Sequence, residues 1–280
     1  MFQDDDPLPA PPSEYRPYHT CWNFFLNLKH EYCSSLECWN DRAPRIKFLQ
    51  VLGNGGQAAI LKVQIDSKIY VLKLFCPRSK FELFATTTDP FFVECQAYDL
   101  MIKADLNGLV GPFCHGWLAI DKDQERKVDK MLRGSFSWNR RQDTASEPIH
   151  GILLEYLHGC NLDKASPPVD AQSLRDKLAR LHSLDTAHGD FKASNIMVSN
   201  GQGYLIDFGA SKLCPNRYLS REALDKWKQD EVNSLEYYLF RLQSLKRFQG
   251  IQLTSATTAE EAYGGELNQW KESEFPKQLE

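Results

Sequence analysis

The chain has 280 residues, of which 42% are hydrophobic and 25% are charged, and its formal net charge is −4. This length and apolar content suit one large domain or two lobes with a packed core, and they exclude a fully disordered chain. The charge argues against a general nucleic-acid-binding protein, because no surplus of Lys and Arg exists to neutralise phosphates.

Targeting and redox signals are weak throughout the sequence. The eight cysteines are scattered without a C-x-x-C pair, so neither a zinc site nor a disulfide framework is indicated. The first residues are acidic and rich in proline, whereas a signal peptide would be basic and then apolar, and no apolar run reaches membrane-spanning length. The sequence predicts an intracellular protein, cytoplasmic or nuclear, with no membrane partner.

The N-terminal region 1–44 is expected to be an extension of the main fold. Residues 1–18 contain five prolines among acidic residues, which favours a segment without packed structure. Residues 21–39 are rich in aromatic side chains and are expected to form a helix that docks on the main domain. An autoinhibitory or partner-binding role for this helix is the alternative.

A strand at 46–51 leads into a glycine-rich turn formed by Gly53, Asn54, Gly55 and Gly56. Residues without a Cβ let backbone amides approach an anion, as in loops that cover nucleotide phosphates. An ordinary hairpin turn has a similar composition, so this motif carries little weight by itself.

The next predicted strand, 68–75, places Lys73 inside a nearly continuous apolar run. A buried ammonium group requires a counter-charge. Asp89 and Pro90 have the form of a helix N-cap followed by proline at the first helical position. The helix that follows contains Glu94, which we expect to pair with Lys73.

Two further segments complete the first half of the chain. Residues 121–148 are polar and too long for an ordinary hairpin loop, so they are expected to form an inserted loop. Residues 150–159 have the pattern of a buried strand followed by a turn.

The stretch 187–209 carries the strongest chemical signal. It contains His188, Asp190, Lys192 and Asn195, and about a dozen residues later the run Asp207-Phe208-Gly209. The pattern H-x-D-x-K-x-x-N followed by D-F-G is a signature of protein kinases. The apolar runs between the two halves predict a hairpin that presents both acids on one side. A surface turn and a strand end would explain either half alone.

From about residue 46 to 245 the chain resembles the protein-kinase-like superfamily, because these motifs occur in the order found there. The resemblance implies an α+β, two-lobed fold with ATP and Mg²⁺ in the cleft. The β-rich N-lobe is expected at 45–156 with the insertion 121–148, a shortened helical C-lobe at 157–248, and a polar tail at 249–280. A helix over 221–245 is expected to bond to the catalytic turn through Asp230.

The resemblance also implies a role for each site residue. Asp190 would orient or deprotonate the attacking hydroxyl, Lys192 would stabilise the phosphoryl group, and Asn195 and Asp207 would hold Mg²⁺. The residues expected to bind the nucleotide are Gly53, Asn54, Gly55, Gly56, Lys73, Glu94, Glu155, Leu157 and Asp207, with Glu155 and Leu157 in the linker that meets the adenine.

Three departures from the family pattern narrow the function. Gly189 replaces the arginine of many regulated kinases, no A-P-E follows Gly209, and the chain ends before the later helices of a large lobe. The H-G-D motif is similar to that of the small atypical kinase of the KEOPS complex.

The sequence predicts a protein Ser/Thr kinase with an unidentified protein substrate. The alternatives are a small-molecule kinase of the aminoglycoside or choline phosphotransferase type and a pseudokinase that acts as a binding module.

Overall fold

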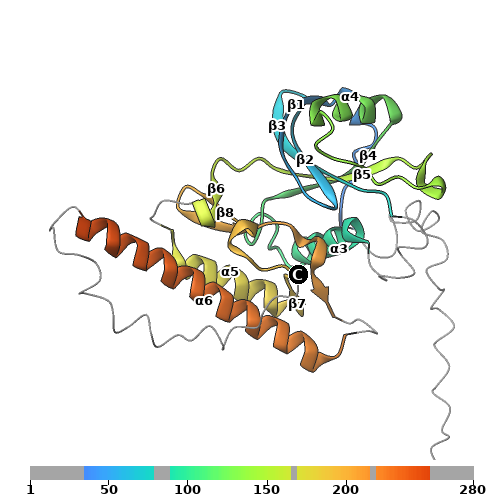
Figure 1. The fold of residues 1–280 in the computed structure, drawn as a ribbon. Coiled ribbons are helices and arrows are strands. Elements are labelled where there is room, and N and C mark those ends of the chain that lie inside the picture. The colour runs from blue at the N-terminus through green and yellow to red at the C-terminus, as the bar shows by residue number, and fades with distance from the viewer. Residues whose placement is uncertain (1–34, 79–88, 165–168, 215–218, 253–280) are drawn as a thin grey trace, which may run out of the picture.

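The computed structural model describes residues 35–78, 89–164, 169–214 and 219–252, and it has the α+β, two-lobed architecture expected from the sequence (Figure 1). A β-rich lobe with two helices comes first in the chain, and a mainly helical lobe follows it. The predicted tail after 252 and most of the predicted N-terminal extension lie outside the described residues. No helix within the described ranges is long and apolar enough to cross a membrane.

The N-lobe is built on one antiparallel sheet of five strands in the order β1-β2-β3-β5-β4. The helices α3 and α4 pack on opposite faces of this sheet. Residues of α3 belong to one buried cluster and residues of α4 to another, and successive side chains along the strands alternate between the two clusters. Its elements are η1 (Ala43–Arg45), β1 (Lys47–Asn54), β2 (Ala58–Ile65), β3 (Lys68–Phe75), α3 (Pro90–Lys103), β4 (Cys114–Ile120), α4 (Lys122–Leu132), η2 (Gln142–Thr144) and β5 (Ile149–Glu155).

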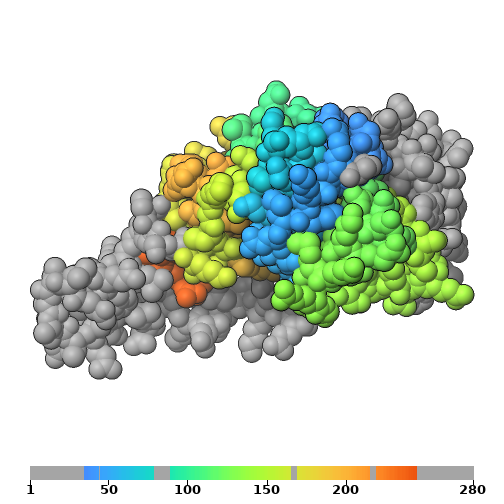
Figure 2. Space-filling view, turned by 90° about the horizontal axis from the view of Figure 1, so that it is seen from above, coloured from blue at the N-terminus to red at the C-terminus, as the bar shows by residue number. Residues whose placement is uncertain are grey.

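The insertion between β4 and β5 contains a helix, where the sequence was expected to form a loop. Asp121 and Gln124 form a reciprocal capping box at the start of α4, and Val128 and Leu132 bury their side chains against the sheet. Gln124, Val128 and Leu132 recur every four residues, which is a helical period. The charged residues between them hid that pattern. Figure 2 shows this segment in green beside the blue β1–β2 region.

The C-lobe is organised around two helices, and short strands carry the motif residues between them. The helix α6 extends to Gln252, so the predicted start of the tail at 249 lies inside it. The predicted hairpin between the two motif halves is confirmed as β8 and β9. The elements are β6 (Cys160–Asn161), η3 (Leu162–Lys164), α5 (Ala171–Ser183), β7 (Thr186–Ala187), η4 (Ala193–Asn195), β8 (Ile196–Ser199), β9 (Gln202–Leu205), η5 (Phe208–Ala210), β10 (Lys212–Leu213) and α6 (Arg221–Gln252).

Candidate nucleotide and phosphotransfer site

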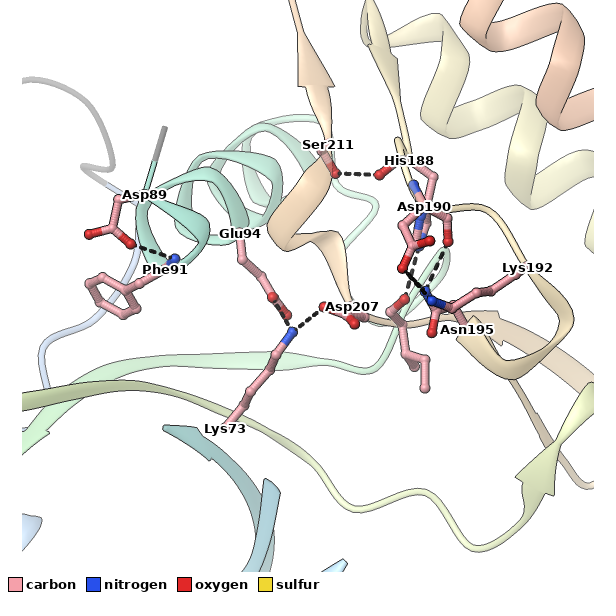
Figure 3. A network of polar contacts seen from close by, with 11 residues as sticks. Lys73, Asp89, Phe91, Glu94, His188, Asp190, Lys192, Asn195, Asp207 and Ser211 are labelled. Atoms are coloured by element: carbon pink, nitrogen blue, oxygen red, sulfur yellow. Dashed lines mark hydrogen bonds and ion pairs between the residues drawn. The ribbon is translucent and has the colours of Figure 1, made fainter. Parts of the chain in front are cut away.

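Three residues that are far apart in the chain meet between the lobes. Lys73 Nζ on β3 lies 2.5 Å from Glu94 Oε2 on α3 and 2.5 Å from Asp207 Oδ1 at the start of η5 (Figure 3). Asp89 caps α3 by accepting a hydrogen bond of 2.9 Å from the amide of Phe91, with proline at the first helical position. The ion pair and the helix start expected from the sequence are therefore confirmed.

Burial and charge act against each other in this triad. Lys73 and Glu94 are buried, whereas the Asp207 side chain is about half exposed. Burial alone would lower the pKa of Lys73, but the two carboxylates raise it above its usual value. Burial, together with the negative charge of Asp207, raises the pKa of Glu94 although Lys73 opposes it. At Asp207 burial also acts to raise the pKa, but Lys73 and the weaker influences of His188 and Lys192 leave it below its usual value. The triad has two carboxylates and one ammonium group, and a second cation bound at the exposed Asp207 would balance the remaining negative charge.

The turn at 188–195 brings together Asp190, Lys192 and Asn195. Asp190 Oδ2 accepts hydrogen bonds from Lys192 Nζ at 2.7 Å and from Asn195 Nδ2 at 2.9 Å. Asn195 Nδ2 also donates to the backbone oxygen of Asp190 at 2.9 Å. Both amide bonds use Nδ2, so Asn195 Oδ1 accepts no hydrogen bond from the described residues. This oxygen is of the kind that Mg²⁺ prefers.

The turn is anchored by Glu231 of α6, not by Asp230 as expected from the sequence. Glu231 Oε1 accepts the amide of Gly189 at 2.7 Å, and Oε2 accepts the amide of His188 at 3.0 Å. The same Oε2 lies 2.8 Å from His182 Nε2 at the end of α5. Glu231 is buried, whereas Asp230 is one position earlier on the helix and only half-buried. Two adjacent acids look equivalent in a sequence, and only the rotation of the helix decides between them.

An aromatic column joins the two lobes beside these charges. The ring of Tyr98 meets the ring of Phe208 edge-on at 5.4 Å, and Phe208 lies 5.1 Å from the imidazole of His188. His188 Nε2 donates to the backbone oxygen of Ile206 at 2.9 Å. Burial lowers the pKa of His188, so the ring is held neutral inside the column.

The departure at Gly189 has a steric cause in this fold. Its φ is +79°, and a Cβ at this position would lie 2.1 Å from the backbone oxygen of Ala210. Ser211 Oγ also donates to the backbone oxygen of His188 at 3.3 Å, and β10 pairs with β7. The segment after Asp207 is therefore fixed directly against the turn at 188–195.

The glycine-rich turn and the linker are the predicted nucleotide contacts from the N-lobe. A Cβ added at Gly53, Gly55 or Gly56 would meet none of the described residues within 4 Å, so packing against that part of the chain does not require these glycines. Open space on this side suits a loop that a phosphate group approaches. Asn54 Nδ2 donates to Ser135 Oγ of the insertion at 3.2 Å.

In the linker, the backbone of Glu155 is already part of the fold. Its amide donates to the backbone oxygen of Phe113 at 2.8 Å, and its carboxylate accepts the amide of Phe113 at 3.2 Å. Lys62 Nζ lies over the ring of the next residue, Tyr156, at 4.2 Å. Leu157 follows in the same irregular segment, and its contact with an adenine stays a prediction.

The residues present fit a magnesium nucleotide. The half-exposed Asp207 carboxylate and the Oδ1 atom of the buried Asn195 are hard oxygen ligands, Lys73 is a fixed cation, and the glycine turn leaves room above the backbone. This is the donor set that phosphoryl-transfer sites use.

The fold, the order of the motifs and the convergence of the charged side chains define a protein of the protein-kinase-like class. The family model described as kinetochore Sim4 complex subunit FTA2 matches residues 32–212. That range covers more than half of the chain and every site residue named above except Glu231. The chain belongs to this family.

Curated relatives support the same class. The chain is 28% identical over 201 residues to a probable serine/threonine-protein kinase of Dictyostelium discoideum, which covers 69% of this chain and 11% of that protein. It is 29% identical over 94 residues to the EKC/KEOPS complex subunit BUD32 of Yarrowia lipolytica, covering 31% of this chain and 35% of the relative. Similarity to the serine/threonine-protein kinase PknG of Mycobacterium leprae is 30% over 87 residues, or 27% and 11% of the two chains. The chain thus spans about a third or less of these relatives.

Proposed function

We propose that the protein transfers the γ-phosphoryl group of ATP, with Mg²⁺, to a Ser or Thr hydroxyl of a protein. The observation that carries this proposal is the meeting of Lys73, Glu94 and Asp207 beside the bonded group of Asp190, Lys192 and Asn195 (Figure 3). The names of the kinases among the relatives support the same reaction class.

In this proposal the residues act mainly by position and charge. ATP would supply the phosphoryl group, and Mg²⁺ would neutralise its oxygens. Lys73, held by Glu94, would bind the α- and β-phosphates, while Asp207 and Asn195 would hold the metal. Asp190 would orient the acceptor hydroxyl and take its proton, and Lys192 would leave Asp190 to stabilise the transferring group.

A small-molecule acceptor is the second candidate, because only a short segment of chain separates Gly209 from α6, and this suits an acceptor smaller than a peptide. The strand β10 ends at Leu213, and α6 begins soon afterwards at Arg221.

The names of the matching family and of the Yarrowia relative both describe subunits of complexes. We therefore extend the proposal to protein partners, at a nuclear site such as the kinetochore.

Incubation with γ-labelled ATP and Mg²⁺ tests the reaction. We expect label to appear on the protein itself or on an added protein with wild type, and to fall by at least a hundredfold with Asp190→Asn and with Asp207→Ala. Asp123→Asn is the matched control, because Asp123 is an exposed aspartate of α4 paired with Arg126. This control should retain wild-type transfer.

The acceptor and the nucleotide affinity separate the alternatives. Label that appears only on an added aminoglycoside or on added choline would favour the small-molecule kinase. Nucleotide binding by wild type without transfer to any acceptor would favour the pseudokinase. Transfer that is equal in wild type and in both site variants would refute the proposed site.

A further inference from the structure

Two buried polar atoms on α3 lack a well-aligned hydrogen-bond partner among the described residues, although the backbone amide of Phe208 lies near enough to the Glu94 carboxylate to lower the pKa of Glu94. They are Glu94 Oε1 and the hydroxyl oxygen of Tyr98. Both side chains are almost completely buried, with relative exposures of 0% and 1%. The two residues are four positions apart on one helix, so they lie on the same face, one turn from each other.

A buried acceptor and a buried donor one helical turn apart on the same face of α3, each without a well-aligned partner, require an explanation. A buried polar group without a partner loses its hydration and gains nothing in return, and native proteins supply such groups with a partner or an ordered water. A tyrosine hydroxyl donates one hydrogen bond, and a carboxylate only accepts. A water molecule can accept the first bond and donate the second, which satisfies both atoms.

The electrostatics of the two groups point to the same shared environment. Burial raises the pKa of Tyr98 well above its usual value, and the negative charge of Glu94 raises it further, followed by smaller effects of Cys114 and Asp207. The hydroxyl therefore keeps its proton and remains a donor. It also lies within the electric field of the triad carboxylates.

We propose that one buried water molecule bridges the Tyr98 hydroxyl and Glu94 Oε1, and that Tyr98 is a positioning residue for the Lys73–Glu94 ion pair. Glu94 would then be fixed at both oxygens, by Lys73 at Oε2 and by the water at Oε1. The ring of Tyr98 packs on Phe208. One side chain would link the aromatic column to the charged triad, so that a shift of Phe208 would be felt at Lys73.

Crystal structures of wild type and Tyr98→Phe, at a resolution that shows ordered water, test the site directly. We expect a peak at hydrogen-bond distance, about 2.5–3.2 Å, from both atoms in wild type, and its loss in the variant. The effect on affinity rests on the proposed function: Mg²⁺-ATP should bind Tyr98→Phe roughly tenfold more weakly, as for other outer-shell partners. Tyr70→Phe is the control, because Tyr70 is buried in the other core cluster against Trp39 and His115.

The outcomes are separable. No peak in wild type overturns the water site, and a peak that survives in Tyr98→Phe with unchanged ATP affinity overturns the role of Tyr98. If wild type binds no nucleotide, the proposed function fails, while the presence of the peak and its loss in Tyr98→Phe still decide the water site. If Tyr98→Phe is more stable than wild type and neither structure shows the peak, the buried hydroxyl lowers the stability of the protein without a compensating hydrogen bond.

Discussion

At the residue scale, Gly189 meets two separate requirements that can be measured apart. Its φ of +79° lies in the region that favours glycine, and its missing Cβ leaves room for the backbone oxygen of Ala210. Gly134, just after α4, has nearly the same φ of +76°, but a Cβ there would meet no atom of the described ranges within 4 Å. The two glycines share the backbone requirement and differ in the steric one.

The pair Gly189→Ala and Gly134→Ala therefore isolates the steric cost. We expect Gly134→Ala to lose about 1 kcal/mol of unfolding free energy through backbone strain alone. Gly189→Ala should lose at least about 2 kcal/mol more, because backbone must move to admit the methyl group. Urea unfolding of both variants gives the difference. Equal losses would mean that the turn and the segment after Gly209 separate easily.

At the element scale, the start of α3 contains an acid whose pKa is raised by burial. Burial raises the pKa of Asp89 from 3.8 to about 6, against the opposing effects of the Phe91 amide and of Arg78. The folded state then binds the proton more tightly than the unfolded state. The contribution of Asp89 to stability is therefore most favourable below about pH 4 and is lost as pH rises to about 6.

Asp89→Asn should remove this pH dependence while it keeps a good N-cap. We expect the melting temperature of the variant, relative to wild type, to rise between pH 4 and pH 7. Asp170, the N-cap of α5, is the opposite control, because its bond from the amide of Ser173 lowers the pKa of Asp170. As pH rises through the range below the usual pKa of aspartate, Asp170→Asn should become less stable than wild type. The difference in stability should then remain constant up to neutral pH. Parallel curves for the two variants would contradict this assignment.

At the scale of the whole molecule, one buried cluster continues from the N-lobe into the C-lobe. It includes Phe91 and Tyr98 of α3, Leu174 and Leu178 of α5, and Leu235 of α6. A second cluster lies on the outer face of the sheet under α4. Because the first cluster takes side chains from both lobes, the lobes are expected to unfold together and not as independent domains.

Leu178→Ala tests this coupling. Leu178 is 1% exposed, so the truncation should cost about 2–5 kcal/mol. Hydrogen exchange under native conditions should then accelerate in β3 of the N-lobe as well as in α5. Leu49→Ala is the control, because Leu49 is 44% exposed on β1, and it should change little. Faster exchange confined to the C-lobe would show that the lobes unfold separately.

The fold class and the meeting of Lys73 with Glu94 could be predicted because each depends on a motif in a fixed order. The anchor Glu231 could not, because Asp230 beside it has the same chemistry and only the packing of α6 on α5 and β7 selects one of them. The helix α4 was missed because its apolar residues are few among charges, although their spacing was regular. The roles assigned to Glu155 and Leu157 came from the resemblance alone and stay predictions.

The close approach of Gly189 to Ala210 also bears on how this turn can change over evolutionary time. A glycine codon becomes an arginine codon by a single base change, and arginine is the residue that regulated kinases use here to receive a phosphate. In this fold the substitution would drive a side chain into a neighbouring peptide group. Natural variants should therefore keep glycine at this position unless the opposing strand has moved first.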